Sequence, residues 1–201
     1  MRVLLAVLSP LNVELGASQI ALNLANALRN LGIEAVVWSP YPIHERMPWW
    51  RQLSWMRGRL NEFVDQNGPF DIVDVLPAAV TSAIGKDRVI VARSVQPDLL
   101  YLWNSTRFGK AHRRIGFVRW FIEAFFNLYL ALLVVYGWCL ATRILCLGSI
   151  EFEWMRKWFP WWCRKLSVYV CAIAEDEREA LKHIRQARRA RSSADKRIFA
   201  G

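Results

Sequence analysis

The chain has 201 residues, of which 54% are hydrophobic and 22% are charged. This length and composition suffice for one α/β core or two small domains, and they exclude a disulfide-stapled miniprotein and a wholly disordered chain. Lys and Arg outnumber Asp and Glu by 27 to 17, which gives a formal charge of +10 and predicts an anionic partner: nucleic acid, an acidic membrane surface or a phosphorylated ligand. The eleven Trp residues favour the membrane, because Trp concentrates at membrane–water boundaries.

The cysteines carry no signature of a metal or redox site. Cys139, Cys146, Cys163 and Cys171 form no CxxC pair and have no histidines at ligand spacing beside them. We therefore expect reduced thiols in a cytoplasmic protein, with no metal and no cofactor. The N-terminal segment 1–8 has a run of only six apolar residues, 3–8, which is too short for a secretory signal, and this run is predicted to be a buried strand.

Apolar runs and helical spacings alternate along the chain. Strands are predicted at residues 3–8, 34–38, 71–76, 88–92, 143–147 and 166–171. Helices are predicted at 20–31, ended by Gly32, and at 49–66, 78–84, 117–140 and 150–158, with a polar, basic loop at 94–114. This order indicates a Rossmann-like α/β fold, a doubly wound parallel sheet of six or seven strands.

The composition changes abruptly after Glu175. A charged stretch extends to Lys196, and the last five residues, 197–201, are typical of the start of a new strand. We therefore predict one Rossmann-like domain at 1–175, followed by a charged helix or linker at 176–201 that leads into a second domain.

The first predicted strand is followed by a candidate anion site. Gly16, Ala17 and Ser18 lie at a helix N-terminus, where free backbone N–H groups and the helix dipole attract phosphate. Ligands of open α/β sheets bind at the carboxyl ends of the strands, which is where this loop lies. The alternative is that Ser18 simply caps its helix, since the loop has no GxGxxG motif.

Two more polar clusters follow predicted strands. Arg93, Ser94 and Gln96 offer a guanidinium, a hydroxyl and an amide, either for a ligand or as a solvated turn. Ser149 and Glu151 follow the fifth strand, where helix capping is favoured over binding. Because parallel strands end at one edge of the sheet, we expect any ligand, carrying phosphate or sugar hydroxyls, to lie where these loops and the first loop converge.

Residues 124–142 contain no formal charge and would form a helix of about 28 Å, close to the roughly 30 Å of a bilayer core. Spanning would separate the strand at 143–147 from the earlier strands, so we predict instead a peripheral helix on a membrane surface rich in anionic lipid. Spanning and a buried central helix remain the alternatives. The expected membrane contacts are Arg113, Arg114, Trp120, Phe125 and Trp138.

No catalytic set can be assembled from spacing, because the three histidines are scattered through polar surroundings. The catalytic residues therefore stay unassigned. The chain has no RNP, KH or zinc-finger pattern, and its aromatic residues lie in apolar runs, so a nucleic-acid partner is not expected.

Several segments together resemble the N-terminal domain of GT-B glycosyltransferases of the family-4 type, and the resemblance covers essentially the whole chain. They are the first strand at 1–8, Gly16-Ala17-Ser18, the helix up to Gly32, and the segments 34–40, 70–73, 141–149 and 166–171. The resemblance implies half an enzyme, because such transferases pair two Rossmann-like domains, with the acceptor mostly on the N-terminal one and the nucleotide-sugar mostly on the other.

The resemblance also implies roles for particular loops. The loop from Gly16 to Ser18 would approach the donor diphosphate and the acceptor, although the usual second glycine is missing. A histidine commonly follows the fourth strand in the family, where this chain has Arg93-Ser94. The glutamate pair of the donor domain cannot be present because the chain stops at Gly201, so the resemblance implies a truncated product or one half of a two-chain enzyme.

The expected function is that of an acceptor-side domain of a nucleotide-sugar-dependent hexosyltransferase at the cytoplasmic face of a membrane. Its partners would be a nucleotide-sugar, a sugar or lipid-linked acceptor, and a separate donor-binding half, without which it would not transfer sugar. The alternative is a non-catalytic membrane-surface binding or scaffold module. Transfer would rest on positioning and on electrostatic stabilisation of a leaving diphosphate. The observation that separates the two hypotheses is whether this reading frame, or the next one, continues into a Rossmann half with paired glutamates.

Overall fold

A computed structural model describes residues 1–12, 14–43, 47–85, 87–96, 98–113, 116–169, 179 and 181–187, without the side chains at 49–50 and 107–113. The chain divides into two units, Met1–Cys171 and Ala172–Gly201. In the second unit, residues 181–187 are helical. The predicted domain boundary at 175 lies outside the described residues.

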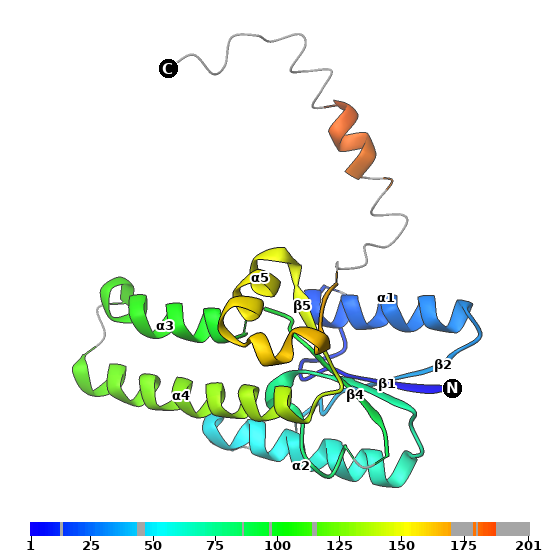
Figure 1. The fold of residues 1–201 in the computed structure, drawn as a ribbon, viewed down its shortest axis with the longest axis horizontal. Coiled ribbons are helices and arrows are strands. Elements are labelled where there is room, and N and C mark those ends of the chain that lie inside the picture. The colour runs from blue at the N-terminus through cyan, green and yellow to red at the C-terminus, as the bar shows by residue number, and fades with distance from the viewer. Residues whose placement is uncertain are drawn as a thin grey trace. The chain divides into compact units, whose positions relative to one another are not determined.

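The first unit is built on one six-stranded sheet in which every pairing is parallel, with the strand order β2-β1-β3-β4-β5-β6 (Figure 1). The predicted Rossmann-like α/β fold is therefore confirmed. The strands are β1 (Arg2–Ala6), β2 (Glu34–Trp38), β3 (Ile72–Val75), β4 (Val89–Arg93), β5 (Arg143–Leu147) and β6 (Leu166–Tyr169).

Helices cover both faces of this sheet, as the doubly wound fold requires. They are α1 (Gly16–Asn30), α2 (Trp49–Asn67), α3 (Asp98–Arg113), α4 (Phe117–Leu140) and α5 (Gly148–Trp158), with short 3-10 turns η1 (Pro77–Ala79) and η2 (Pro160–Lys165). Figure 1 shows α1 on one side of the strands and α2 and α4 on the other.

Alternation along β1 separates two cores. Val3 and Leu5 pack with Ala25 of α1 in the smaller core, whereas Leu4 points into the larger core on the opposite face. In the larger core, Trp138 of α4 is surrounded by side chains of the sheet, α2, α5 and η2, and its ring lies 5.7 Å from that of Trp162 in an edge-on arrangement. Buried aromatic pairs of this kind dominate core energetics, so α4 is anchored at its C-terminal end.

The end of α1 follows the prediction from Gly32. Gly32 has a φ of +76°, a left-handed conformation that glycine adopts without a Cβ penalty. Its N–H donates to the Arg29 carbonyl at 2.9 Å, and the Ile33 N–H donates to the Leu28 carbonyl at 3.0 Å. These two bonds form a Schellman motif, which satisfies the last carbonyls of the helix.

Two predicted segments are wrong. Residues 94–114 were expected to form a loop, but 98–113 form α3, which packs alongside α4 as a helical hairpin (Figure 1). The segment shows no apolar periodicity because its contacts are partly polar: Trp120 Nε1 donates to the Thr106 carbonyl at 3.1 Å, and Asn127 Nδ2 donates to Thr106 Oγ1 at 2.9 Å. The helix expected at 78–84 is only the short turn η1, which Pro77 begins.

Gly137 allows α4 to lie against η1. A Cβ at this position would lie 1.9 Å from the Pro77 carbonyl oxygen, which is far inside van der Waals contact. Only glycine permits this close approach of two backbones. The contact holds the C-terminal part of α4, where its buried residues Val134, Gly137 and Trp138 lie, whereas Trp120 near its start bonds to α3.

Candidate functional site

The chain places β2 on one side of β1 and β3 on the other, so the strand order reverses between β1 and β3. A small cavity lies at the carboxyl ends of these two strands. It has a volume of about 110 Å³ and is lined by the ends of β1, β3 and β4 and the start of α1, with Ala17, Asp74 and Arg93 among its residues. Open α/β sheets bind ligands at this kind of reversal. Residues of the predicted loops after β1 and β4 therefore meet here, whereas Ser149 and Glu151 of the third predicted loop do not line this space. We name it the switch-point cavity.

A buried ion pair between two strands forms part of the wall of the switch-point cavity. Arg93 Nε donates to Asp74 Oδ1 at 3.0 Å, and the two side chains are 6% and 7% exposed. Burial raises the pKa of Asp74, although the charge and hydrogen bond of Arg93 oppose this shift. Asp74 on the adjacent strand thus holds the Arg93 guanidinium through its Nε, and a contact between Arg93 and a ligand stays a prediction.

Asp74 was missed as a site residue. It lies within the apolar strand β3, and its neighbour in register on β4 is Val91, two residues before Arg93. A single acid inside an otherwise apolar buried strand is the signal that identifies it, since charges are rarely buried without a partner.

Ser18 holds the loop that precedes α1. Its side chain is fully buried, with Oγ donating to the Pro10 carbonyl at 2.6 Å and lying 3.0 Å from Ser9 Oγ. The alternative that Ser18 caps its helix is wrong, because α1 starts at Gly16 and its N-cap, Leu15, makes no side-chain bond. Among the described residues, no side chain caps the N-cap of α1, and Ala17 of its first turn borders the cavity.

A buried acidic cluster joins the ends of β4 and β6 to the starts of α3 and α5. Ser94 Oγ donates to Asp98 Oδ2 at 2.9 Å, and the Tyr169 hydroxyl donates to the Ser94 carbonyl at 2.5 Å. The Leu147 N–H donates to Glu151 Oε2 at 2.5 Å. Ser94 and Glu151, both predicted site residues, are therefore buried in a network that connects four segments.

Both carboxyl groups of the cluster hold protons more tightly than in water. Burial and the nearby charge of Glu151 raise the pKa of Asp98 to about 7, although its bond from Ser94 opposes this. Burial also raises the pKa of Glu151, against the hydrogen bonds that it accepts. Because the pKa of Asp98 is raised to about 7, this carboxyl changes charge near neutral pH.

The remaining predicted residues lie on the surface. Ser149 is exposed in the first turn of α5 and is not its N-cap, because the helix begins one residue earlier, at Gly148 with a φ of +82°. Glu151 takes the capping role instead, because its Oε2 accepts a hydrogen bond from the N–H of Leu147, the N-cap residue. Gln96 is exposed and borders a separate hollow between α3 and α4, so it does not join the switch-point cavity.

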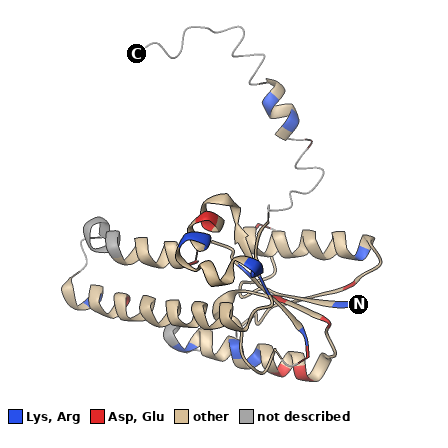
Figure 2. Cartoon of the chain, viewed as in Figure 1, with Lys and Arg blue, Asp and Glu red and all other residues tan. Residues whose placement is uncertain are grey.

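The exposed side of α4 carries a long apolar stripe. At 100° per residue, its members fall within an arc of about 140° and extend over roughly 29 Å. Charge is absent from this arc: Arg119 and Glu123, the charged residues of α4, pair with each other at 3.2 Å on another side of the helix. Figure 2 shows α4 uncoloured by charge over most of its length. The apolar stripe consists of Phe117, Val118, Phe121, Ile122, Phe125, Leu128, Tyr129, Leu132 and Tyr136.

The expected membrane contacts divide between surface and core. Phe125 is 69% exposed, whereas Trp138 is 1% exposed, so its prediction as a membrane contact is wrong: it fills the larger core. Trp120 is half-buried against α3. The side chain of Arg113 and the whole of Arg114 lie outside the described residues. Among the residues described, α4 is the one helix long and apolar enough to cross a membrane.

Comparison with known proteins does not identify a family for this chain, because no family model and no curated protein matches it. Within the described ranges, no group of three His, Cys, Asp or Glu side chains is placed to hold a metal ion. The chain has a Rossmann-like sheet, a mainly apolar cavity at its reversal point that is bordered by Asp74 and Arg93, and an apolar stripe on α4.

Proposed function

We propose that this chain is the acceptor-side domain of a nucleotide-sugar-dependent glycosyltransferase that works on a membrane surface. The observation that carries the proposal is the apolar stripe of α4, fixed to the sheet whose carboxyl edge holds the switch-point cavity. A monomeric soluble domain rarely exposes so large an apolar patch. A transferase with a lipid-linked acceptor needs such a surface, because its substrate remains in the bilayer.

The geometry of α4 favours a helix that lies in the interface. Its C-terminal end is held in the core by Trp138, and the chain then enters β5, which pairs with β4. The strands before and after α4 therefore belong to one sheet, which a spanning helix would divide between two sides of the bilayer. An in-plane helix inserts its apolar arc, while the net charge of +10 attracts anionic lipid.

The switch-point cavity supports a role in transfer by positioning and electrostatics. The uncapped first turn of α1 offers backbone N–H groups to an anionic group such as a leaving diphosphate. The proposal includes a donor-binding half, because in the fold that the chain resembles the nucleotide-sugar binds mainly to a second Rossmann-like domain. The domain described here would place the acceptor and complete one wall of the cleft.

A second candidate is a non-catalytic membrane-surface module, and one observation favours it. Arg93 is held by Asp74, and the cavity of about 110 Å³ is smaller than the roughly 300–1,000 Å³ of typical ligand sites. In this case the sheet would serve only to present the apolar stripe.

The test restores the purified chain to an extract, membranes included, of its source cell with the gene deleted. Labelled UDP-, GDP- and ADP-sugars are added one at a time, and label in the lipid and polymer fractions is counted. We expect chain-dependent label with one donor. If none gives label while the chain still floats with the membranes, the transferase proposal fails and the surface module takes its place.

A further inference from the structure

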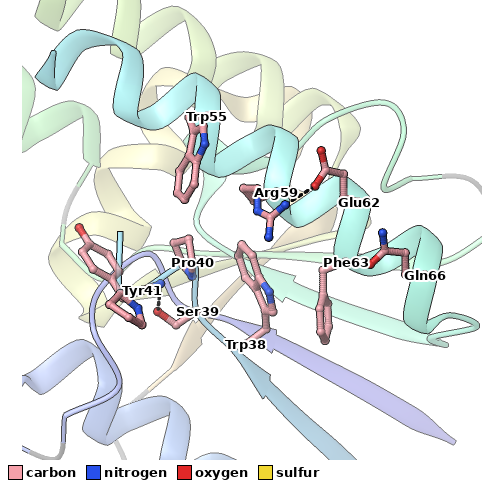
Figure 3. Close-up of a pocket in the computed structure, with 10 residues that line it drawn as sticks. Trp38, Ser39, Pro40, Tyr41, Trp55, Arg59, Glu62, Phe63 and Gln66 are labelled. Carbon is pink, nitrogen blue, oxygen red and sulfur yellow. Dashed lines mark hydrogen bonds and ion pairs between the residues drawn. The ribbon is translucent and has the colours of Figure 1, made fainter. Parts of the chain in front are cut away.

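A second, larger cavity lies between α2 and the segment that follows β2. Its volume is about 410 Å³, within the range of small-molecule sites. Figure 3 shows α2 contributing Trp55, Arg59 and Gln66 to one wall, with Trp38 and Tyr41 on the other. None of its lining residues borders the switch-point cavity. We name this space the aromatic cavity.

Half-buried aromatic rings supply its apolar surface. The rings of Trp38 and Phe63 lie 5.7 Å apart with an interplanar angle of 36°, and Trp55 and Tyr41 are half-buried around the same space. No hydrogen bond joins either indole N–H, or the Tyr41 hydroxyl, to another described residue. Flat apolar faces with unengaged donors at their rims suit a ligand that is apolar on its faces and polar around its edge.

The polar groups of the aromatic cavity cancel in charge. Arg59 Nη1 and Glu62 Oε2 lie 2.7 Å apart, and no other charged residue among those described lines the space. The Gln66 amide has no hydrogen-bond partner among the described residues. Ser39 is already engaged, because its Oγ donates to the Ser9 carbonyl at 2.7 Å. The cavity thus offers planar donors and acceptors with no net charge, which disfavours an ion and favours a neutral ligand.

We propose that the aromatic cavity binds a neutral saccharide unit, a hexose or hexosyl residue. The C–H faces of a sugar ring pack on indole and phenyl faces, and neighbouring hydroxyls match the paired N–H groups of Arg59 and the two oxygens of Glu62. Binding requires no transfer reaction, so the inference stands apart from the proposed function.

The aromatic cavity lies next to the switch-point cavity at one edge of the sheet. Trp38 ends β2, and its carbonyl accepts a hydrogen bond at 2.9 Å from the N–H of Val7, which lines the switch-point cavity. A saccharide in the aromatic cavity would therefore lie at the ligand-binding edge of a parallel sheet, not at a remote surface.

Ligand-observed saturation-transfer NMR on the full chain tests the proposal with the methyl glycosides of glucose, galactose, mannose and N-acetylglucosamine. We expect at least one to bind, with Trp55→Ala and Arg59→Ala each weakening it tenfold or more. Trp158→Ala is the matched control for the indole. Arg156→Ala is the control for the charge, because Arg156 pairs with Glu153 three residues away on α5 with the same degree of exposure.

Gln66→Ala, at an exposed position, provides a further readout if Trp55→Ala proves unstable, and it should weaken binding severalfold. Circular dichroism of each variant separates loss of binding from loss of fold. The proposal is overturned if no glycoside binds, if the control variants weaken binding as much as the cavity variants, or if phosphocholine or inorganic phosphate displaces the sugar and binds more tightly.

Discussion

Phe125 and Trp138 lie in the same uncharged stretch of α4, yet Phe125 is 69% exposed and Trp138 is 1% exposed. The difference arises from neighbours and not from composition. Gly137 brings the end of the helix against Pro77, and the core closes around Trp138, whereas Phe125 lies on the side of the helix that faces away from α3. One apolar segment therefore performs two tasks: it anchors the hairpin and presents the apolar stripe.

The largest expected effect separates the two ends of α4 directly. Trp138→Ala leaves a large void among Phe159, Trp162 and the sheet, and should lower the free energy of unfolding by about 3–5 kcal/mol. Phe125→Ala removes an exposed side chain and should change it by less than about 0.5 kcal/mol. Urea unfolding measures both variants. Equal losses would show that Phe125 is buried in solution.

The close contact at Gly137 is the next test. Gly137→Ala forces a Cβ into the Pro77 carbonyl oxygen, so the backbone must shift, at an expected loss of about 1–3 kcal/mol of unfolding free energy. Gly58→Ala is the matched control, because a Cβ there meets no atom within 4 Å. That change should stabilise α2 by up to about 1 kcal/mol. A neutral Gly137→Ala would show that α4 is not held at this point.

The base of the hairpin should respond to pH through Asp98, the first residue of α3. Its pKa is raised to about 7 in the folded chain from 3.8, so its contribution to stability is complete below pH 3.8 and is lost as pH rises through about 7. Asp98→Asn cannot ionise and still accepts the bond from Ser94. We expect the variant to be more stable than the parent at pH 8 by on the order of 1–2 kcal/mol.

Thermal unfolding of both proteins between pH 5 and pH 8 gives the comparison. Asp65→Asn, which removes an exposed carboxyl on α2, is the control for the change in net charge. Glu151 remains in the variant, and its pKa is also raised, so the decline with pH should become smaller without disappearing. An identical decline in parent and variant would contradict the assignment of this proton to Asp98.

The strand and helix alternation was sufficient to predict the sheet, because runs such as 34–38 and 143–147 are apolar after their first residue and match β2 and β5 residue for residue. The same reasoning missed α3, whose residues acquire their helical partners only when α4 lies beside them. It also placed Trp138 on the surface, since a local pattern cannot distinguish an apolar residue that packs against Phe159 and Trp162 from one that meets solvent.

The candidate site shows the same limit. Backbone topology brought Ala17 and Arg93 together as predicted, because the ends of parallel strands meet at one edge. What the side chains do there depends on pairs across strands, such as Arg93 with Asp74, which no single segment reveals. The aromatic cavity was missed for a related reason: Trp38 and Arg59 belong to elements whose contact follows only from the crossover of α2 over the sheet.

The smallest expected effect concerns the membrane. Replacing Phe125 and Leu128 together by serine removes two large side chains from the apolar stripe, and should weaken binding to phosphatidylglycerol vesicles at least tenfold, about 1.4 kcal/mol. The free energy of unfolding should be unaffected, since both side chains are exposed. The matched control replaces Leu31 and Ile150, apolar residues outside α4 that are even more exposed, and should leave vesicle binding unchanged. Parent binding should fall with salt and be weaker on phosphatidylcholine, because screening removes the attraction of the basic chain to anionic lipid. Carbonate-resistant binding would instead indicate that α4 spans the bilayer, and equal losses in both double variants would show that the stripe is not the contact surface.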